Sequence, residues 1–218
     1  FLKAQGVNDD LVSLADPRVF QTLDGMIGSV KPEAWKAYLR WRVGDAMAPY
    51  LSASFRDAGF GFRGRLLQGQ QEPSPRWQQV LDAINTAAGP MLGRQYADRY
   101  LSAEARKRAG EIADNVRKAQ IAAVQRSSWL SDAAKAEAGA KLEKLKIEIG
   151  SPHRDLDYSV QPMGRGSFGG NMLIASTWRH REEMKRIGKG NADRRWDVLP
   201  QQPALAYDLA QNRLIVTA

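Results

Sequence analysis

The chain has 218 residues, a length typical of one large domain or two small ones. Its 43% hydrophobic and 26% charged residues are those of an ordinary globular protein. Cysteine is absent, so the sequence excludes disulfides, thiol nucleophiles, iron–sulfur clusters and thiolate zinc sites. The 32 Lys and Arg against 24 Asp and Glu give a net charge of +8, which permits acidic partners without requiring them.

No apolar run approaches the ~20 residues that a membrane-spanning helix requires, so we expect no membrane span in this chain. The longest apolar run is Ala46 to Leu51. The chain starts at Phe1 rather than Met, and no signal-peptide pattern follows. We therefore expect a processed protein or a fragment of a longer one.

Helix signals dominate the first fifty residues. Asp16 followed by Pro17 is typical of a helix start, because the carboxylate caps free amides and proline fits the first helical position. Apolar residues at helical spacing then continue to Gly28, a plausible stop. Pro32 opens a second helix, and Pro49 should kink or end it.

The middle of the chain continues the helical pattern with interruptions. Residues 57–73 are rich in glycine and predict a loop or a broken helix. The pattern restarts at Ser74-Pro75, is interrupted at Gly89-Pro90 and resumes to Tyr100. Ser102 is expected to cap a long helix that reaches about Gln125.

The last third mixes helices with irregular segments. Ser131 should cap a helix within a run that ends at Gly150-Ser-Pro152, and residues 172–187 predict another helix. Residues 204–218 are the only credible strand segment. The predicted fold class is therefore mainly α, a multi-helix domain with short loops and one or two β-strands near the C-terminus.

One glycine-rich motif has the letters of a phosphate-binding loop. The segment Gly164-Arg-Gly166-Ser-Phe-Gly169 matches G-x-G-x-x-G, whose glycines let backbone amides approach a phosphate. The context does not fit, since Pro162 lies where a preceding strand would be expected. We interpret the segment as a loop that leads into the following helix.

The two histidines do not form a recognisable metal or catalytic motif. His180 could pair with Glu183 one helical turn later, but the H-E-x-x-H arrangement is missing, so we interpret His180 as a surface residue. His153 follows Pro152 in a loop and receives no role. No G-x-S-x-G is present, so a serine nucleophile is not indicated either.

Two stretches are basic. Residues 99–126 and residues 179–195 each carry seven Lys or Arg against three acids. With nearby tryptophans they could follow a phosphate backbone and stack bases. The acids are interleaved at helical spacing, however, which favours solvated helix faces over a nucleic-acid site.

Five segments resemble, in order and over nearly the whole chain, the neprilysin, endothelin-converting enzyme and bacterial oligopeptidase O family of zinc metallopeptidases. They are Trp35-Lys-Ala-Tyr-Leu-Arg-Trp-Arg42 with Ala48–Leu51, Gly69–Trp77 with Val80–Asn85, Leu92–Tyr96 with Tyr100, Trp129–Glu137 with Leu142–Leu145 and Ile149-Gly150, and Asn171–Gly188 with Trp196, Pro200-Gln201 and Asn212–Val216.

The resemblance implies a division of the chain and a missing catalytic half. Residues 1–190 would be the mostly helical region that includes the gate domain, which caps the active-site chamber and limits substrates to peptides. Residues 191–218 would be a linker and an edge strand of a catalytic domain. The family's zinc-binding motif lies beyond this strand, so zinc would belong to the parent protein and this chain alone would bind none.

The edge strand supplies the candidate binding residues. The resemblance implies that a peptide substrate pairs with this strand, which points to Ala206 and Tyr207 as substrate-binding residues. The family usually has Asn-Ala followed by aromatics here, and these positions fall on Ala204-Leu205 or, with a one-residue gap, on Leu205-Ala206. Either way the asparagine is missing, and neither alanine nor leucine offers its amide donor and acceptor.

The sequence therefore predicts the N-terminal and gate portion of a zinc metalloendopeptidase that hydrolyses short peptides. The fragment alone should have no catalytic site, and its expected partners are peptides and the missing catalytic half. The resemblance also implies a periplasmic or secreted location. A degenerate family member that serves as a peptide-binding or assembly scaffold remains an alternative, and a basic helical nucleic-acid-binding protein is a weaker one. We expect no nucleic-acid partner.

Overall fold

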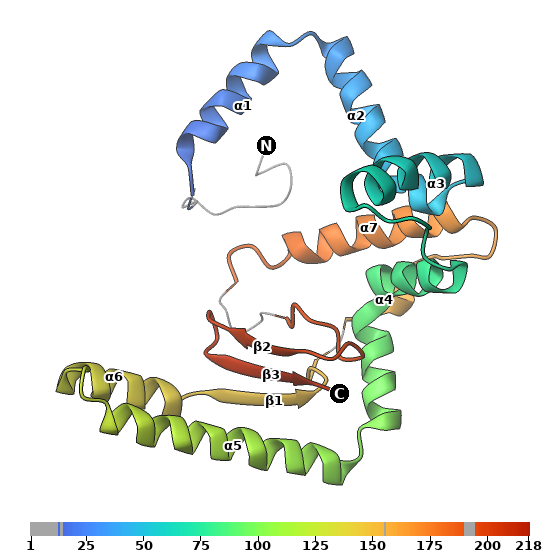
Figure 1. Cartoon of the computed structure of the whole chain (residues 1–218). Helices are drawn as coiled ribbons and strands as arrows, with labels where there is room; N and C mark the ends of the chain where they lie inside the picture. Colours follow the sequence, from blue (N-terminus) through green and yellow to red (C-terminus); the bar gives the residue numbers. More distant parts are fainter. Residues whose placement is uncertain (1–12, 14, 155, 190–194) are drawn as a thin grey trace. The chain divides into compact units, whose positions relative to one another are not determined.

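The computed structural model describes residue 13 and residues 15–154, 156–189 and 195–218 (Figure 1). The structure is mainly helical, as predicted, with a small three-stranded sheet. The helices are α1 (Pro17–Ser29), α2 (Pro32–Met47), α3 (Ala53–Gly59), α4 (Arg76–Tyr100), α5 (Ala103–Arg126), α6 (Asp132–Glu143) and α7 (Phe168–Met184). The shorter helical segments are η2 (Ala48–Tyr50), η3 (Phe60–Leu67) and η4 (Tyr158–Val160), and the strands are β1 (Lys146–Gly150), β2 (Leu205–Asp208) and β3 (Arg213–Thr217).

The chain divides into two compact units, each made of two separate stretches. The first unit comprises Phe1–Ala83 and Gln161–Gly188, and the second comprises Ile84–Val160 and Lys189–Ala218. The second unit contains the whole sheet, which joins β1 to two strands that follow residue 190. The predicted boundary at residue 190 between a gate region and a catalytic edge strand stays a prediction.

In the first unit, local signals placed the helix ends correctly. The Asp16 side chain accepts a hydrogen bond of 3.0 Å from the Arg18 amide, so α1 begins where predicted. Helix α2 gives way after Met47 to the short segment η2, which contains Pro49. The glycine-rich stretch forms a broken helix in which α3 passes into the π-helical segment η3.

Helix α1 exposes its apolar side chains. Five of them recur at helical spacing and each is at least 44% exposed: Val19, Phe20, Leu23, Met26 and Ile27. None of the helix's residues is buried. The helix is amphipathic, and among the described residues of its own unit its apolar side has no covering layer.

An ion pair fastens η3 to α2. Arg63 donates two hydrogen bonds to the Asp45 carboxylate, one of them 3.2 Å long from Nε. These hydrogen bonds, together with the positive charge of Arg63, hold the pKa of Asp45 below its ordinary value. The same contact raises the pKa of Arg63.

We expect this pair to add an acid-sensitive part to the stability of the first unit. The pKa of Asp45 is lower in the folded chain than in the unfolded chain, where it is about 3.9. The ion pair's contribution to stability is therefore complete above the unfolded pKa and is lost as the pH falls through the folded pKa. Asp45→Asn should therefore destabilise the chain at pH 7, and the difference from wild type should shrink below about pH 4. Urea unfolding at several pH values measures this. In an Arg63→Met background, the stability difference between Asp45 and Asp45→Asn should no longer depend on pH. A pH-dependent difference in that background would contradict the assignment to this pair.

In the second unit, two helices pack as a hairpin beside the sheet. The Ser102 hydroxyl accepts a 3.0 Å hydrogen bond from the Ala105 amide, and Ser131 accepts one of 3.2 Å from Ala134, so both predicted caps are confirmed. Helix α5 packs against β1 and α6 (Figure 1). The interruption predicted at Gly89-Pro90 is a kink in α4, where Ala88 leaves the helical conformation with φ −148°.

The expectation of strands only near the C-terminus misses β1. The sequence suggested a helical run up to Gly150, but α6 ends at Glu143 and Lys146–Gly150 forms a strand. Ile147 and Ile149 alternate with polar residues, which is the two-residue period of a strand. The strand ends at Gly150, whose φ of +90° suits glycine.

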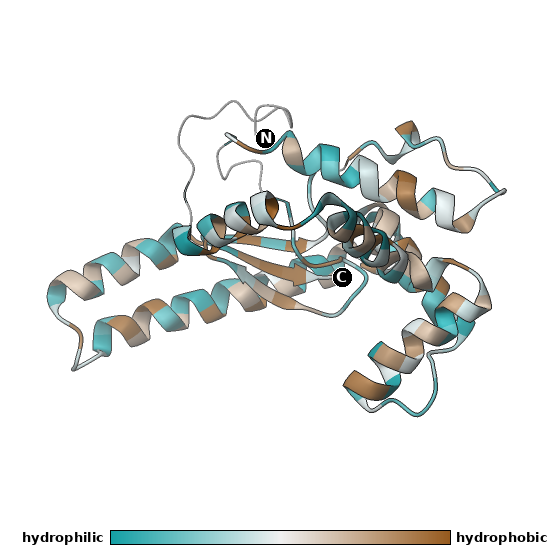
Figure 2. Ribbon diagram, turned by 90° about the horizontal axis from the view of Figure 1, so that it is seen from above, coloured by the Kyte–Doolittle hydropathy of each residue, from teal (hydrophilic) through white to brown (hydrophobic). Residues whose placement is uncertain are grey.

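Residues 204–218 form a hairpin rather than a single strand. Strand β2 pairs antiparallel with β3, and β3 pairs parallel with β1, so the order is β1-β3-β2. Asn212 adopts a φ of 47° just before β3, a conformation that asparagine tolerates in turns. The strands are largely apolar in Figure 2.

The two faces of the sheet have different neighbours. Ile149 points to α5, because the Cδ1 atom of Ile149 lies 3.5 Å from the position that a Cβ would take at Gly110 of α5. Ile215 belongs to the opposite face by alternation along β3 and is fully buried. On that face the segment from Trp196 to Gln201 covers the sheet, since Trp196 bonds to Glu148 and Pro200 accepts a 3.0 Å hydrogen bond from the Ala218 amide.

The same segment packs tightly on α4. Pro200 is fully buried, and the Gln201 amide donates to Asn85 Oδ1 at 2.8 Å and to the Gly89 carbonyl at 3.2 Å. A Cβ at Gly93 would lie only 2.5 Å from Pro200 Cδ, so glycine is needed there for the close approach. Helix α4 and the chain that follows residue 195 are thereby joined within the second unit.

Candidate functional site

Strand β2 forms one edge of the sheet. Among the described strands its one neighbour is β3, and residues Leu205 to Asp208 pair with Val216 to Arg213 in that order. The Thr217 amide donates a 3.2 Å hydrogen bond to the Ala204 carbonyl, which makes Ala204 and Thr217 a directly bonded pair. Bonded and non-bonded pairs alternate along an antiparallel ladder.

This alternation decides which backbone groups of β2 face outward. Ala206 and Asp208 fall on bonded pairs, so their amides and carbonyls point to β3. Leu205 and Tyr207 fall on non-bonded pairs, so their amides and carbonyls point away from β3. An extended peptide can therefore pair with the edge at Leu205 and Tyr207.

The sequence-predicted residues Ala206 and Tyr207 both lie on this strand, with different roles. Tyr207 has outward backbone groups, whereas the backbone groups of Ala206 are used by β3. Sequence reasoning did not select Leu205, because the outward positions depend on the register of the hairpin. The turn signal before β3, where Asn212 precedes Arg213, could have indicated that register.

Tyr207 is fixed by a small polar network. Its hydroxyl donates to Asn212 Oδ1 at 2.8 Å, and Asn212 Nδ2 donates to the Lys141 carbonyl at 2.7 Å. Lys141 Nζ lies 5.7 Å from the centre of the tyrosine ring, within the range of a cation–π contact. The edge strand is thus connected to α6 as well as to β3. Leu205 by contrast is 74% exposed.

A buried cluster of charges lies behind the edge, on the sheet face covered by Trp196. Arg213 Nη2 donates to Asp208 Oδ2 at 2.9 Å, and Arg213 Nη1 donates to the two Glu148 oxygens at 3.1 and 3.3 Å. Trp196 Nε1 donates to the same Glu148 carboxylate. Sequence reasoning missed this cluster, because Glu148 and Arg213 are 65 residues apart.

The glycine-rich loop is closed by a side chain of its own helix. Asn171 Oδ1 accepts from the Gly164 amide at 3.1 Å, and Asn171 Nδ2 donates to the Gly164 carbonyl at 2.6 Å. Ser167 caps α7 by accepting from the Gly170 amide at 2.9 Å. The segment thus leads directly into a helix, as interpreted from the sequence, and this helix starts at Phe168.

A pocket of about 630 Å³ lies in the first unit between the end of α2 and the start of α7. Its lining is mostly apolar and includes Met47, Leu51 and Leu173. Tyr50 and Phe168 meet there edge to face with ring centres 5.6 Å apart. The pocket offers apolar contact surface, and the described residues that line it include no acidic or basic side chain.

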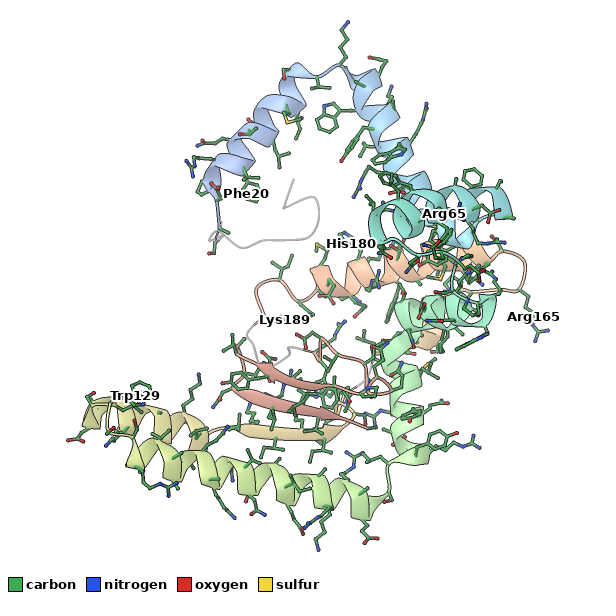
Figure 3. All side chains as sticks on the ribbon, viewed as in Figure 1. Phe20, Arg65, Trp129, Arg165, His180 and Lys189 are labelled. Carbon is green, nitrogen blue, oxygen red and sulfur yellow. The ribbon has the colours of Figure 1, made fainter. Side chains whose placement is uncertain are left out.

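The histidines lie apart from the edge strand in sequence and are exposed. His180 is on α7 (Figure 3), and its predicted partner Glu183 accepts a 2.8 Å hydrogen bond from Arg186. His153 is in the loop after β1. Within the described ranges, no group of three or more His, Asp or Glu side chains could hold a metal ion. The residues of this part of the chain therefore do not fit a zinc site.

The interleaved charges of the basic stretches form ion pairs along the helices. On α5, Lys118 lies 2.9 Å from Asp114, and Glu111 is paired at 3.5 Å with Arg108. On α7, Lys185 and Glu182 are 2.5 Å apart. These pairs have the spacing that the sequence predicted for helix faces.

Among the described helices, none is long and apolar enough to cross a membrane.

The described part of the chain is mainly helical with a small mixed sheet, and β2 leaves one edge of that sheet open, an arrangement with which an extended peptide can pair. Residues 1–152 match the sequence model described as "Peptidase family M13", so the chain belongs to peptidase family M13. Two relatives illustrate the similarity. Neprilysin-2 of Drosophila melanogaster is 23% identical over 72% of this chain and 22% of that protein. Neutral endopeptidase of Lactobacillus helveticus is 27% identical over 66% of this chain and 22% of that protein.

Solved structures show the same fold. The zinc metalloprotease Zmp1 of Mycobacterium tuberculosis, in complex with an inhibitor, superposes with a TM-score of 0.81 at 27% identity. The superposition covers 89% of this chain and 29% of that one. The open state of the same protease gives a TM-score of 0.75 over 90% of this chain and 30% of that one. The chain thus spans less than a third of the length of these relatives.

Proposed function

We propose that this chain is the N-terminal and gate portion of a neprilysin-like zinc metallopeptidase that hydrolyses short peptides, and that β2 holds the backbone of the substrate. Membership of peptidase family M13 supports the reaction class. The observation that carries the binding role is the outward backbone of Leu205 and Tyr207 on a strand whose other side is fixed to β3.

The strand would bind peptides through backbone groups alone. The position where the family usually has asparagine is occupied by Ala204 or Leu205, and neither side chain can donate or accept a hydrogen bond. Recognition by the amides and carbonyls of Leu205 and Tyr207 does not depend on the side chains of the substrate. We therefore propose a broad preference among extended peptides at this edge.

Zinc would be held by residues outside this chain. The described residues contain no group of three or more His, Asp or Glu side chains that could hold the metal. When bound elsewhere in the protein, zinc supplies a polarised water for peptide hydrolysis. The contribution of this chain would be to position the peptide and, with residues 1–190, to limit access to short substrates.

The remaining part of a longer protein would also be a structural partner. The relatives are more than three times longer than the matched segments, and the apolar side of α1 is exposed from Val19 to Ile27. Exposed apolar stripes of this kind are usually covered in a native protein. We propose that the catalytic half covers this side of α1. A periplasmic or secreted location stays a prediction from the resemblance.

The full-length gene product tests the proposal directly. We expect it to cleave a quenched fluorescent peptide, to lose that activity with a chelator and to recover it with zinc. The 218-residue chain alone should show no cleavage under the same conditions. Absence of cleavage by the full-length protein, together with retained binding of the peptide, would favour the non-catalytic scaffold instead. Cleavage by the 218-residue chain would refute the assignment of the catalytic residues to the rest of the protein.

A further inference from the structure

The buried charges behind β2 require an explanation beyond stability. The Arg213 side chain is 6% exposed and the Asp208 side chain 3% exposed, so both charges are almost completely removed from water. Taking a charge out of water is energetically costly, and apolar residues of similar size often give equal or greater stability. A cluster whose burial is costly can instead serve to specify one arrangement of the strands.

The cluster joins all three strands at fixed positions. Asp208 is the last residue of β2, Arg213 is the first of β3, and Glu148 is in the middle of β1. Arg213 contributes both of its terminal nitrogens, one to each carboxylate. The planar fork of an arginine fixes direction as well as distance, which a lysine cannot do.

This arrangement selects one register of β2. A slip of one residue would turn every side chain of the strand to the opposite face. Asp208 would then leave Arg213, and a buried guanidinium would lose one of its two carboxylates, which is a strongly unfavourable state. The same slip would exchange the backbone groups that face outward, so that Ala206 rather than Leu205 and Tyr207 would point to the free edge.

The segment that precedes β2, at Arg195 and Trp196, also contacts the cluster. Trp196 donates its indole N–H to Glu148, and the Arg195 carbonyl accepts from Arg213 Nη2 at 3.4 Å. The position of this segment is therefore coupled to the same guanidinium. The Arg213 guanidinium thus contacts β1, β2 and the segment that covers the sheet.

We propose that Arg213 is the positioning residue of the peptide-binding edge: by binding Asp208 and Glu148 together it holds β2 in the one register that presents the backbone of Leu205 and Tyr207. The inference rests on the proposed function of β2 in binding peptides. Arg213 acts through the strand and does not touch the substrate. Loosening the strand weakens binding in the ground state and the transition state alike, so KM should change and kcat should not.

The test uses the full-length gene product with Arg213→Met and Arg213→Lys. For Arg213→Met we expect KM for the peptide to rise about tenfold with kcat within about twofold, and the Ala206 and Asp208 amides to exchange hydrogen about tenfold faster. Arg213→Lys, which keeps the charge without the fork, should lie between wild type and Arg213→Met. Arg117→Met, which removes another arginine of this unit paired with a carboxylate, should leave KM and these amides unchanged.

A triple variant keeps the test valid if Arg213→Met fails to fold with Asp208 left unpaired. Arg213→Met/Asp208→Leu/Glu148→Met replaces the cluster by apolar residues and should keep the thermal midpoint near that of wild type. We expect its KM and its β2 amide exchange to stay raised. Wild-type KM and exchange in this variant would overturn the proposal. If the wild-type protein neither cleaves nor binds a peptide, the proposed function fails. The exchange rates of the β2 amides still decide whether Arg213 positions the strand.

Discussion

Gly93→Ala is expected to destabilise the chain by about 1–3 kcal/mol, although alanine is the better helix former. Gly93 lies within α4, where alanine should by itself add up to about 1 kcal/mol. The added Cβ, however, would lie 2.5 Å from Pro200 Cδ and 2.7 Å from Pro200 Cγ. The proline ring is rigid and fully buried, so it cannot rotate away, and either α4 or the segment at Leu199–Gln201 must move.

The measurement is urea unfolding of Gly93→Ala beside a matched control. Gly110→Ala introduces the same methyl group into α5 of the same unit, where its Cβ would lie at an ordinary 3.5 Å from Ile149. We expect the control to be neutral or slightly stabilising. Equal midpoints for the two variants would contradict the packing of Pro200 on α4. A loss confined to Gly93→Ala would confirm it.

Leu205→Pro is expected to raise KM of the full-length protein about tenfold while leaving the hairpin folded. Proline removes the Leu205 amide, which points away from β3, and so removes one donor to a paired peptide. The amides of Ala206 and Asp208, which face β3, are kept. Proline is tolerated at edge-strand positions whose amide faces outward, and Leu205 is 74% exposed, so little packing is lost.

Two controls separate the amide from the side chain and from the fold. Leu205→Ala keeps the amide and should leave KM near the wild-type value. Ala206→Pro removes a donor to β3 and should disrupt the hairpin, with faster exchange along β3. A wild-type KM for Leu205→Pro would show that the peptide does not pair with this edge.

Local signals in the sequence predicted the helices well. The caps at Asp16, Ser102 and Ser131 act over two or three residues, and the chain shows them without reference to distant partners. Strand β1 was missed because its five residues pair with a strand that begins at residue 213. A short strand of this kind follows directly on a helix, and its stability comes from a partner that the local pattern does not reveal.

The candidate site was predicted only as a segment. The family resemblance indicated the strand around Ala206 and Tyr207, but the register that turns Leu205 outward depends on pairing with Val216. The Arg213 cluster joins residues from three strands, so spacing along the chain gives no sign of it. Spatial convergence of this kind is set by topology, whereas caps and proline breaks are set by neighbours.

The parallel pairing of β1 with β3 has a consequence for how the chain is made. Lys146 leaves the ribosome well before its partner Arg213, and β3 is the central strand of the sheet. The α5–α6 hairpin can form early because its contacts are local, whereas the sheet must wait for residues 205–217. The growing chain therefore carries β1 unpaired until β3 has been made, and the edge formed by β2 is completed after the α5–α6 hairpin.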